Sequence, residues 1–194
     1  MKQQPTLHTA RLTLRPFTLD DAPSIQRLAG AYEVALNTLF IPHPYPDGAA
    51  EQWIGKHQEE LDANRIHHFA LDAEGELIGA MALVMKDAGM AEIGYWIGVP
   101  YWGRGYTAEA AREVLRYGFE ECGLQRIFAG HFTRNVASGR VLQKIGMRYE
   151  GTLRQHMVKW DERVDVAFYG ILRDEFIALD SSRNERQEEE QREH

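Results

Sequence analysis

The chain has 194 residues, of which 44% are hydrophobic and 26% charged, the usual balance of a globular domain. This length suits a single domain with a sizeable core. The formal net charge is −7 and lysines and arginines form no cluster, so the sequence predicts no binding to a nucleic-acid backbone. An acidic surface is compatible with amine-bearing substrates, although solubility explains it equally well.

Cysteine usage and hydropathy narrow the class further. Cys122 is the only cysteine, which excludes an intrachain disulfide and a zinc site built from cysteines. The histidines form neither an HExxH nor a His-x-His pattern, so no metal is expected. No apolar run approaches the ~18 residues of a membrane span, and the first residues contain no leader-like apolar stretch. We therefore expect a cytoplasmic, non-membrane protein.

The N-terminal part of the sequence predicts a strand followed by a helix. Leu12 and Leu14 alternate with polar residues, as in a half-buried strand over residues 11–17. Thr18 is a suitable N-cap for a helix that ends near Gly30, because its hydroxyl can accept a hydrogen bond from the first turn.

Three prolines lie between Ile41 and Gly48 and exclude a regular helix or a central strand there. This segment separates a short predicted helix over residues 33–38 from a longer one over residues 49–64, for which Asp47 is the expected N-cap. The proline loop is interpreted either as a rigid surface turn or as the lining of a pocket.

The middle of the sequence predicts an antiparallel meander of three strands, over residues 66–71, 77–85 and 91–99. The remaining predicted elements are an Ala-rich helix that ends at Gly123, a strand over residues 126–132, a helix from Asn135 to Gly146, and two strands over residues 147–153 and 163–172. The order is therefore strand, two helices, three-strand meander, helix, strand, helix and two strands, which indicates a mixed α/β (α+β) fold.

From Ser181 onward the sequence, SSRNERQEEEQREH, contains no apolar residue. Such a segment cannot bury enough surface to offset its ordering entropy, so a disordered or frayed tail is predicted, with a solvated helix as the alternative. No internal repeat or linker divides the rest of the chain. We therefore expect a single domain over residues 1–180 and a charged C-terminal tail over residues 181–194.

The clearest functional signal is the stretch GYWIGVPYWGRGYTAEAAREVL, residues 94–115, which reads as a strand, a glycine turn and a helix. Glycine allows the backbone to approach a ligand closely, and the N–H groups that open a helix have no internal partner. The helix dipole also favours an anion at this end. The sequence therefore predicts that the phosphates of a cofactor bind at this turn.

Three features together resemble one known family. They are the segment AEIGYWIGVPYWGRGYTAEA, the pair Asn135-x-x-Ser138, and the motif IGM before a strand, in this order along the chain. From about Thr9 to Phe176 the chain resembles a GNAT-type N-acetyltransferase, in the branch related to ribosomal-protein N-terminal acetyltransferases (RimJ/RimL-like). The resemblance implies a GNAT-type fold and transfer of an acetyl group from acetyl-CoA to an amine.

The resemblance also implies a cofactor site. The family signature Gln/Arg-x-x-Gly-x-Gly/Ala falls on residues 102–107, where Trp102 and Thr107 depart from it. Because backbone N–H groups do most of the pyrophosphate binding, neither departure is expected to abolish it. In the family, acetyl-CoA wedges between the central strand and the next one, and its pantetheine pairs with the backbone near residues 97–99. The residues expected to bind the cofactor are Ile97, Gly98, Val99, Gly103, Arg104, Gly105, Tyr106, Thr107, Asn135 and Ser138.

Direct attack of an amine on a thioester needs a base and a proton donor for the departing thiolate. Strand alternation places Glu92 on one face with Gly94 and Trp96, and by resemblance it is the candidate general base. The alternative is a solvated charge or a partner for an arginine. Ser138 is by resemblance the candidate proton donor, against an ordinary first-turn serine. Asn135 either binds pantetheine or only caps its helix.

Other polar side chains have a structural interpretation first. Glu109 stands three residues before Arg112, a spacing that favours a surface ion pair. His67 and His68 are neighbours on a predicted strand, so they point to opposite faces and cannot share a metal. Cys122 lies on the core face of its helix and is expected to be inert.

The energy of deprotonation bears on the acceptor. At pH 7, deprotonation costs about 1 kcal/mol for an α-amine, whose pKa is about 7.8, and about 4.6 kcal/mol for a lysine, whose pKa is about 10.4. With Glu92 as the only base candidate, the N-terminal α-amine of a protein or peptide, or a small amine of similar pKa, is favoured. His43 and Tyr45 in the proline loop are candidates for lining the acceptor pocket, with packing as the default.

The sequence and the resemblance together predict an N-acetyltransferase that works by direct attack of the amine in a ternary complex with acetyl-CoA. The alternative is a non-catalytic module that binds acyl-CoA as a sensor or interaction partner. A nucleotide-dependent enzyme is disfavoured, because no GxxxxGK[ST] motif is present. The length of the acyl group and the oligomeric state are left open, a homodimer included.

Overall fold

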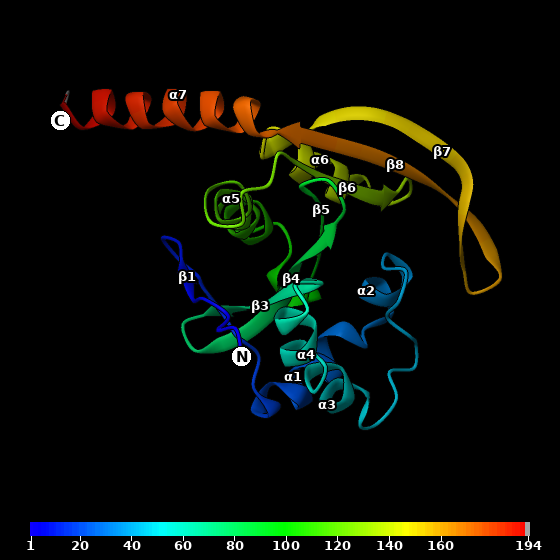
Figure 1. Ribbon diagram of the computed structural model, residues 1–194. Helices are drawn as coiled ribbons and strands as arrows, with labels where there is room; N and C mark the ends of the chain where they lie inside the picture. The colour runs from blue at the N-terminus through cyan, green and yellow to red at the C-terminus, as the bar shows by residue number, and fades with distance from the viewer. Residues whose placement is uncertain (193–194) are drawn as a thin grey trace.

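The computed structural model describes residues 1–192, within which eight strands form a single sheet in the order β1-β2-β3-β4-β5-β6-β8-β7 (Figure 1). The strands are β1 (Leu7–His8), β2 (Thr13–Arg15), β3 (Ile66–Ala73), β4 (Glu76–Lys86), β5 (Met90–Ile97), β6 (Arg126–Phe132), β7 (Arg148–Lys159) and β8 (Glu162–Leu172). The α-helices are α1 (Ala22–Ala29), α2 (Tyr32–Leu36), α3 (Ala49–Ile54), α4 (His57–Asp62), α5 (Tyr106–Glu120), α6 (Val136–Lys144) and α7 (Arg173–Arg192). Two 3-10 turns, η1 (Leu19–Asp21) and η2 (Val99–Tyr101), precede α1 and follow β5.

The middle of the sheet is where the strands part. Neighbouring strands are antiparallel except for β5 and β6, which are parallel. These two pair only over Met90–Glu92 and Arg126–Phe128. After Glu92 and Phe128 the two strands no longer pair with each other. We call the unpaired remainder, residues 93–97 of β5 and 129–132 of β6, the β5–β6 split. The mixed fold and the meander β3–β4–β5 are confirmed. The predicted order of elements also holds, except that β1 precedes the first predicted strand, four helices replace the two expected before β3, and α7 follows β8.

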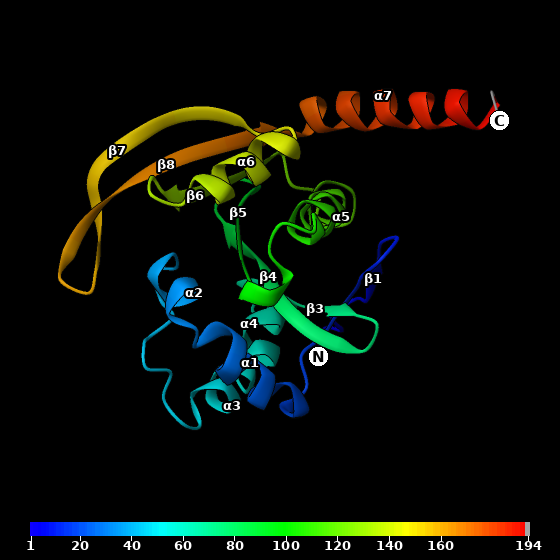
Figure 2. The same ribbon diagram turned by 180° about the vertical axis from the view of Figure 1, so that it is seen from behind.

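Helices cover both faces of the sheet. The main core cluster joins α5 to buried strand residues such as Leu83 and Ile93, while a second cluster joins α1 and α3 to Ala70 and Leu77. Figures 1 and 2 show α1–α4 gathered at the end of the molecule away from α7. The predicted alternation along β5 is confirmed, because Ile93 lies in the main cluster whereas Trp96 packs against the second.

The prediction of one continuous helix over residues 49–64 is wrong. The segment forms two short helices, α3 and α4, separated by Gly55 and Lys56. Glycine is a poor helix former, and the chain turns there so that α4 can pack along β3. Asp47 is not the N-cap of α3 either. Gly48 holds that position with a φ of 75°, and the Asp47 carboxylate instead accepts a hydrogen bond from Gln26 at 2.6 Å.

The ends of two other predicted elements also differ. The central strand stops at Ile97 rather than 99, because Pro100 brings the chain into η2. The last two strands are longer than predicted and form a hairpin that turns at Trp160 and Asp161, both with positive φ. After β8, α7 runs through the charged segment to Arg192, so this segment is helical, as in the alternative prediction, rather than a disordered tail. Residues 193–194 lie outside the described residues.

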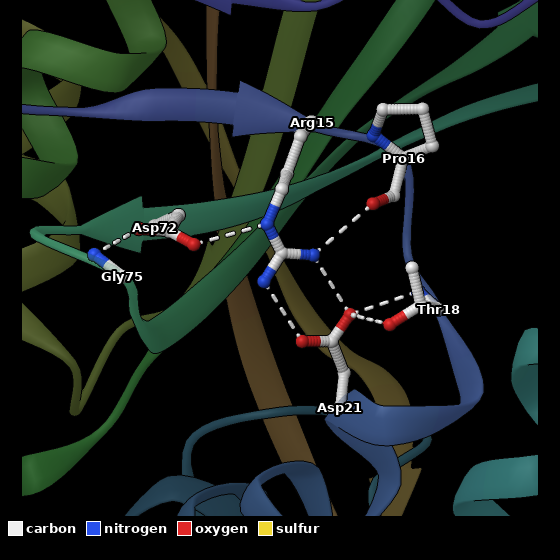
Figure 3. A network of polar contacts seen from close by, with 6 residues as sticks. All are labelled: Arg15, Pro16, Thr18, Asp21, Asp72 and Gly75. Carbon is white, nitrogen blue, oxygen red and sulfur yellow. Dashed lines mark hydrogen bonds and ion pairs between the residues drawn. The ribbon is translucent and has the colours of Figure 1, made fainter.

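A buried ion network fixes the N-terminal strand to the helices (Figure 3). Arg15 on β2 donates to both oxygens of Asp21, at 2.8 and 2.9 Å, and to Asp72 at 3.0 Å. Asp21 also accepts from the Thr18 N–H at 2.8 Å, which completes the capping box at η1. Burial raises the pKa of the Asp21 carboxyl, but the hydrogen bonds from Arg15 and Thr18 outweigh it, so the net shift is downward.

Candidate active site

The glycine turn lies where β5 ends and α5 begins. Gly103 and Gly105 have φ values of 75° and 81°, a region that favours glycine, and a Cβ at Gly103 would meet no atom within 4 Å. Residues 102–105 are exposed. Within the described chain, the backbone N–H groups from Gly103 to Ala108 have no hydrogen-bond acceptor. The turn therefore presents a row of free donors at the N-terminus of α5.

Arg11, which precedes β2, braces this turn from outside. Its guanidinium lies 2.6 Å from Glu109 on α5 and donates to the Arg104 carbonyl at 3.0 Å. It also lies over the Tyr106 ring, 4.5 Å from the centroid. The Glu109 carboxylate in addition accepts from the Thr9 hydroxyl at 2.7 Å. The turn is thus fixed by a segment about a hundred residues away in sequence.

The expected pairing of Glu109 with Arg112 is wrong. Arg112 instead donates to the Lys144 carbonyl at 3.4 Å. Although partial burial alone would raise the pKa of Glu109, the hydrogen bonds from Thr9 and Arg11 lower it overall. Glu109 therefore stays ionised beside the anion-binding turn, where its charge is matched by Arg11.

The end of β5 is tied to the same turn by Trp102. The Trp102 indole donates to the Ile97 carbonyl at 2.7 Å, and the Gly98 N–H donates to the Ile78 carbonyl at 2.9 Å. Of the backbone groups predicted to pair with pantetheine, these two are already bonded within the chain. The Ile97 carbonyl retains a second lone pair, and the Val99 N–H has no acceptor among the described residues.

Across the split, α6 begins beside β6. Asn135 is its N-cap, and the Asn135 side chain accepts from the Ser138 N–H at 3.2 Å. The Ser138 hydroxyl lies 2.8 Å from the hydroxyl of Tyr95 on β5. The N-cap predicted at Asn135 is therefore confirmed, and Tyr95 contacts Ser138 from β5.

Glu92 lies at the point where β5 and β6 part, on the face opposite Tyr95. Its carboxylate is 3.1 Å from the Lys86 ammonium, and its side chain is 34% exposed. Next on this face, a Cβ at Gly94 would meet no heavy atom within 4 Å, and Trp96 follows. Open space over Gly94 thus separates the carboxylate from the indole. The charge partner of Glu92 is a lysine rather than an arginine.

The other candidates lie elsewhere. His67 bonds to Tyr117 and His68 to Glu60, on opposite faces of β3, as predicted. The His43 ring nitrogen Nδ1 donates to the Gly30 carbonyl, 3.0 Å away, while Tyr45 packs against the second core cluster, with α1 and α3. No cluster of three metal-ligating side chains occurs in the part of the chain that the structure describes.

Comparison with known proteins gives the family. Residues 11–148, well over half of the chain, match the Acetyltransferase (GNAT) domain. The chain belongs to the GNAT acetyltransferase family. It is 32% identical to the uncharacterized N-acetyltransferase p20 of Bacillus licheniformis, a match that covers 88% of this chain and 98% of that protein.

Solved structures agree with this family. A GNAT-family acetyltransferase from Bacillus anthracis superposes with a TM-score of 0.78 at 26% identity, over 88% of this chain and 99% of that one. RimL, a ribosomal L7/L12 alpha-N-protein acetyltransferase solved with coenzyme A, superposes with a TM-score of 0.80 over 87% and 98% of the two chains. At 14% identity the likeness to RimL shows the fold alone.

Family membership makes this GNAT protein an N-acetyltransferase that uses acetyl-CoA. Its residues fit that cosubstrate, because the row of free N–H groups suits a pyrophosphate and the β5–β6 split ends beside it. None of the helices over residues 1–192 has the length and apolar character of a membrane span.

Sequence reasoning missed two residues of the site. Arg11 sits 98 positions from Glu109, and no local pattern links them. The alternation that places Glu92, Gly94 and Trp96 on one face places Tyr95 on the other, and Tyr95 does pack against the main core cluster. Alternation alone does not show that this face of β5 is also the one that contacts Ser138 on α6. Alternation along β5 combined with the position of Ser138 could have found it.

Proposed function

We propose that this GNAT acetyltransferase moves the acetyl group of acetyl-CoA to a primary amine of low pKa by direct attack in a ternary complex. The acceptor is the α-amine at a protein or peptide N-terminus, or a small amine of similar pKa. The observation that carries the proposal is the junction of the β5–β6 split with the row of free N–H groups from Gly103 to Ala108. That junction places an anion site beside two strands whose facing edges do not pair with each other past Glu92 and Phe128, which leaves backbone groups of β5 for a thioester arm.

The anion end is assigned to the turn. The N–H groups of Gly103, Arg104, Gly105, Tyr106 and Thr107 bind the pyrophosphate, with the exposed Arg104 side chain adding positive charge. The thioester arm runs along residues 97–99, where the Val99 N–H is a free donor. Asn135 and Ser138 contact the arm from α6.

The two reacting sides of the thioester face different residues. Ser138 and Tyr95 lie on the face of β5 that carries α5 and α6, and Ser138 supplies a hydroxyl proton to the departing sulfur. Glu92 lies on the other face, beside the open space over Gly94, where an amine has room to approach. In this role the Glu92 carboxylate accepts the proton that the amine loses.

The acceptor class follows from the cost of forming the neutral amine. Glu92 is ion-paired with Lys86 and partly exposed. A lysine is brought to its neutral form at pH 7 at a cost of about 4.6 kcal/mol. An α-amine costs only about 1 kcal/mol. RimL, which has the same fold, is an alpha-N-protein acetyltransferase, and the acceptor proposed for this chain is of the same class.

The test is an acceptor panel with acetyl-CoA and detection of free CoA thiol. The panel contains peptides with a free N-terminus, the same peptides with a blocked N-terminus and an internal lysine, polyamines and free amino acids. We expect thiol release with free α-amines that exceeds release with blocked peptides at least tenfold at pH 7. Thiol release only with lysines or polyamines would overturn the acceptor class, and acetyl-CoA binding without thiol release on any amine would overturn the reaction.

A further inference from the structure

We propose that Tyr95 is a positioning residue for the proton donor Ser138. This inference rests on the proposed function. Tyr95 projects from β5 on one side of the split, and Ser138 lies in the first turn of α6 on the other. Their hydroxyl oxygens are 2.8 Å apart, and the Tyr95 hydroxyl is 3.4 Å from the Ser138 carbonyl. The contact therefore joins β5 to α6 at a level where β5 and β6 no longer pair.

The direction of this hydrogen bond can be argued from the atoms available. In the described chain, the Tyr95 hydroxyl has two neighbours within hydrogen-bond distance, the Ser138 hydroxyl and the Ser138 carbonyl. The carbonyl can only accept and so competes for the phenol proton, but at 3.4 Å it is the weaker contact. A phenol is more acidic than an aliphatic hydroxyl, so in the 2.8 Å pair, where either oxygen can donate, we assign the donor role to Tyr95 and the acceptor role to Ser138 Oγ. Burial raises the pKa of Tyr95 to about 12, which keeps the phenol protonated at neutral pH.

A serine that receives this hydrogen bond keeps its own proton for another acceptor. The Ser138 N–H is already bonded to Asn135, and in the described residues no carbonyl of the preceding turn accepts from its hydroxyl. Because the hydrogen bond from Tyr95 occupies one lone pair of Oγ, rotation of the Ser138 hydroxyl about its Cβ–Oγ bond is restricted. Its proton then points toward the split. Without Tyr95, the serine hydroxyl is free to turn back to a helix carbonyl, as first-turn serines commonly do.

The helix that carries Ser138 is held firmly enough for this to matter. Gly139 packs on His131 of β6 so closely that a Cβ there would lie 2.8 Å from the imidazole. His131 is itself fixed by a 2.8 Å contact with the Phe132 carbonyl and by stacking on Tyr169. The backbone of Ser138 is thus set by β6, and its side chain is set by β5.

In the reaction, a bond forms between the amine nitrogen and the acetyl carbon, and the carbon–sulfur bond breaks with its electron pair on sulfur. The Ser138 hydroxyl donates a hydrogen bond to that sulfur, which ends as a thiol. The thiol proton comes from Ser138 Oγ, which regains a proton from solvent, and the proton that the amine loses passes to Glu92 and from there to solvent. Tyr95 remains a phenol throughout, and its hydrogen bond to Oγ offsets the charge that develops on the serine oxygen.

The test compares Tyr95→Phe, Ser138→Ala and the double variant in the full chain, with the best acceptor of the panel. We expect Ser138→Ala to lower kcat by about 100-fold and Tyr95→Phe by about tenfold, with KM for acetyl-CoA within about twofold of wild type. The double variant should match Ser138→Ala, because Tyr95 acts only through the serine.

Tyr117→Phe is the control, because Tyr117 packs in the same main core cluster as Tyr95 and its hydroxyl also makes a 2.8 Å contact, with His67 on β3. It should keep the wild-type kcat. Wild-type kcat in Tyr95→Phe, or losses that multiply in the double variant, would overturn the inference while the proposed function stands. A wild-type protein that turns over no amine would overturn both.

Discussion

The Arg11 guanidinium lies 2.6 Å from the Glu109 carboxylate and connects the segment before β2 to the first turn of α5. The same guanidinium donates to the Arg104 carbonyl, inside the glycine turn. One arginine therefore sets the position of a loop whose own backbone N–H groups have no partner in the described chain. A partly exposed ion pair adds little to folding, so its main effect should be on the ligand that the turn binds.

Arg11→Gln should weaken acetyl-CoA binding about three- to tenfold and change the free energy of unfolding by no more than about 1 kcal/mol. Isothermal titration and urea unfolding measure the two quantities. Arg116→Gln is the control, because Arg116 pairs with Glu113 and Glu120 farther along α5. Equal affinity in the two variants would contradict the bracing role.

Gly105→Ala tests the turn itself. Its φ of 81° costs an L-residue about 1–2 kcal/mol, and relaxation of that strain would turn the N–H groups away from a ligand. We expect a loss of stability together with at least a tenfold loss of acetyl-CoA affinity. Gly75→Ala, at a φ of 87° in the β3–β4 turn, should lose comparable stability and no affinity. If both alanine variants bound acetyl-CoA as wild type does, the pyrophosphate would lie elsewhere.

Glu92→Gln tests the base. The amide keeps the shape and hydrogen-bonding capacity of the carboxylate but cannot accept a proton at neutral pH. Turnover should fall about 100-fold, with acetyl-CoA affinity within about twofold of wild type. Lys86→Gln, which removes the partner at 3.1 Å, should leave turnover within about threefold. Unchanged kcat in Glu92→Gln would remove this residue from the mechanism.

The network around Arg15 predicts how stability depends on pH. The folded-state pKa of Asp21 is depressed below its value in the unfolded chain, so its contribution is fully present above the unfolded pKa and is lost as pH falls through the folded one. The free energy of unfolding should therefore decline below about pH 4. Asp21→Asn should lower stability at pH 7 and flatten this acid limb in urea titrations. An unchanged acid limb would assign the decline to other carboxylates.

Much of the fold could be predicted from the sequence, because local patterns carried it. Alternation of residue types predicted β5 and the opposite faces of Ile93 and Trp96. Asn135 predicted the start of α6, where it is the N-cap in the structure. The glycine turn was predictable for the same reason, since positive φ and a helix N-terminus are both local properties.

The parts that escaped prediction depend on tertiary contacts. Nothing near Glu109 in sequence shows that its partner is Arg11, and the i,i+3 spacing to Arg112 pointed to the wrong residue. The break between α3 and α4 required knowledge of how α4 packs on β3. Tyr95 was placed on the correct face, but the residue opposite it belongs to a helix more than forty positions away.

The most direct measurement is the position of the acetyl group on one peptide that carries a free α-amine and a single internal lysine. The peptide is incubated with the protein and acetyl-CoA at pH 7 and mapped by fragmentation mass spectrometry. We expect one acetyl group on the α-amine, formed in step with the release of one equivalent of CoA thiol. Acetylation of the lysine alone, or no acetylation of this peptide or any other amine while acetyl-CoA is bound, would contradict it.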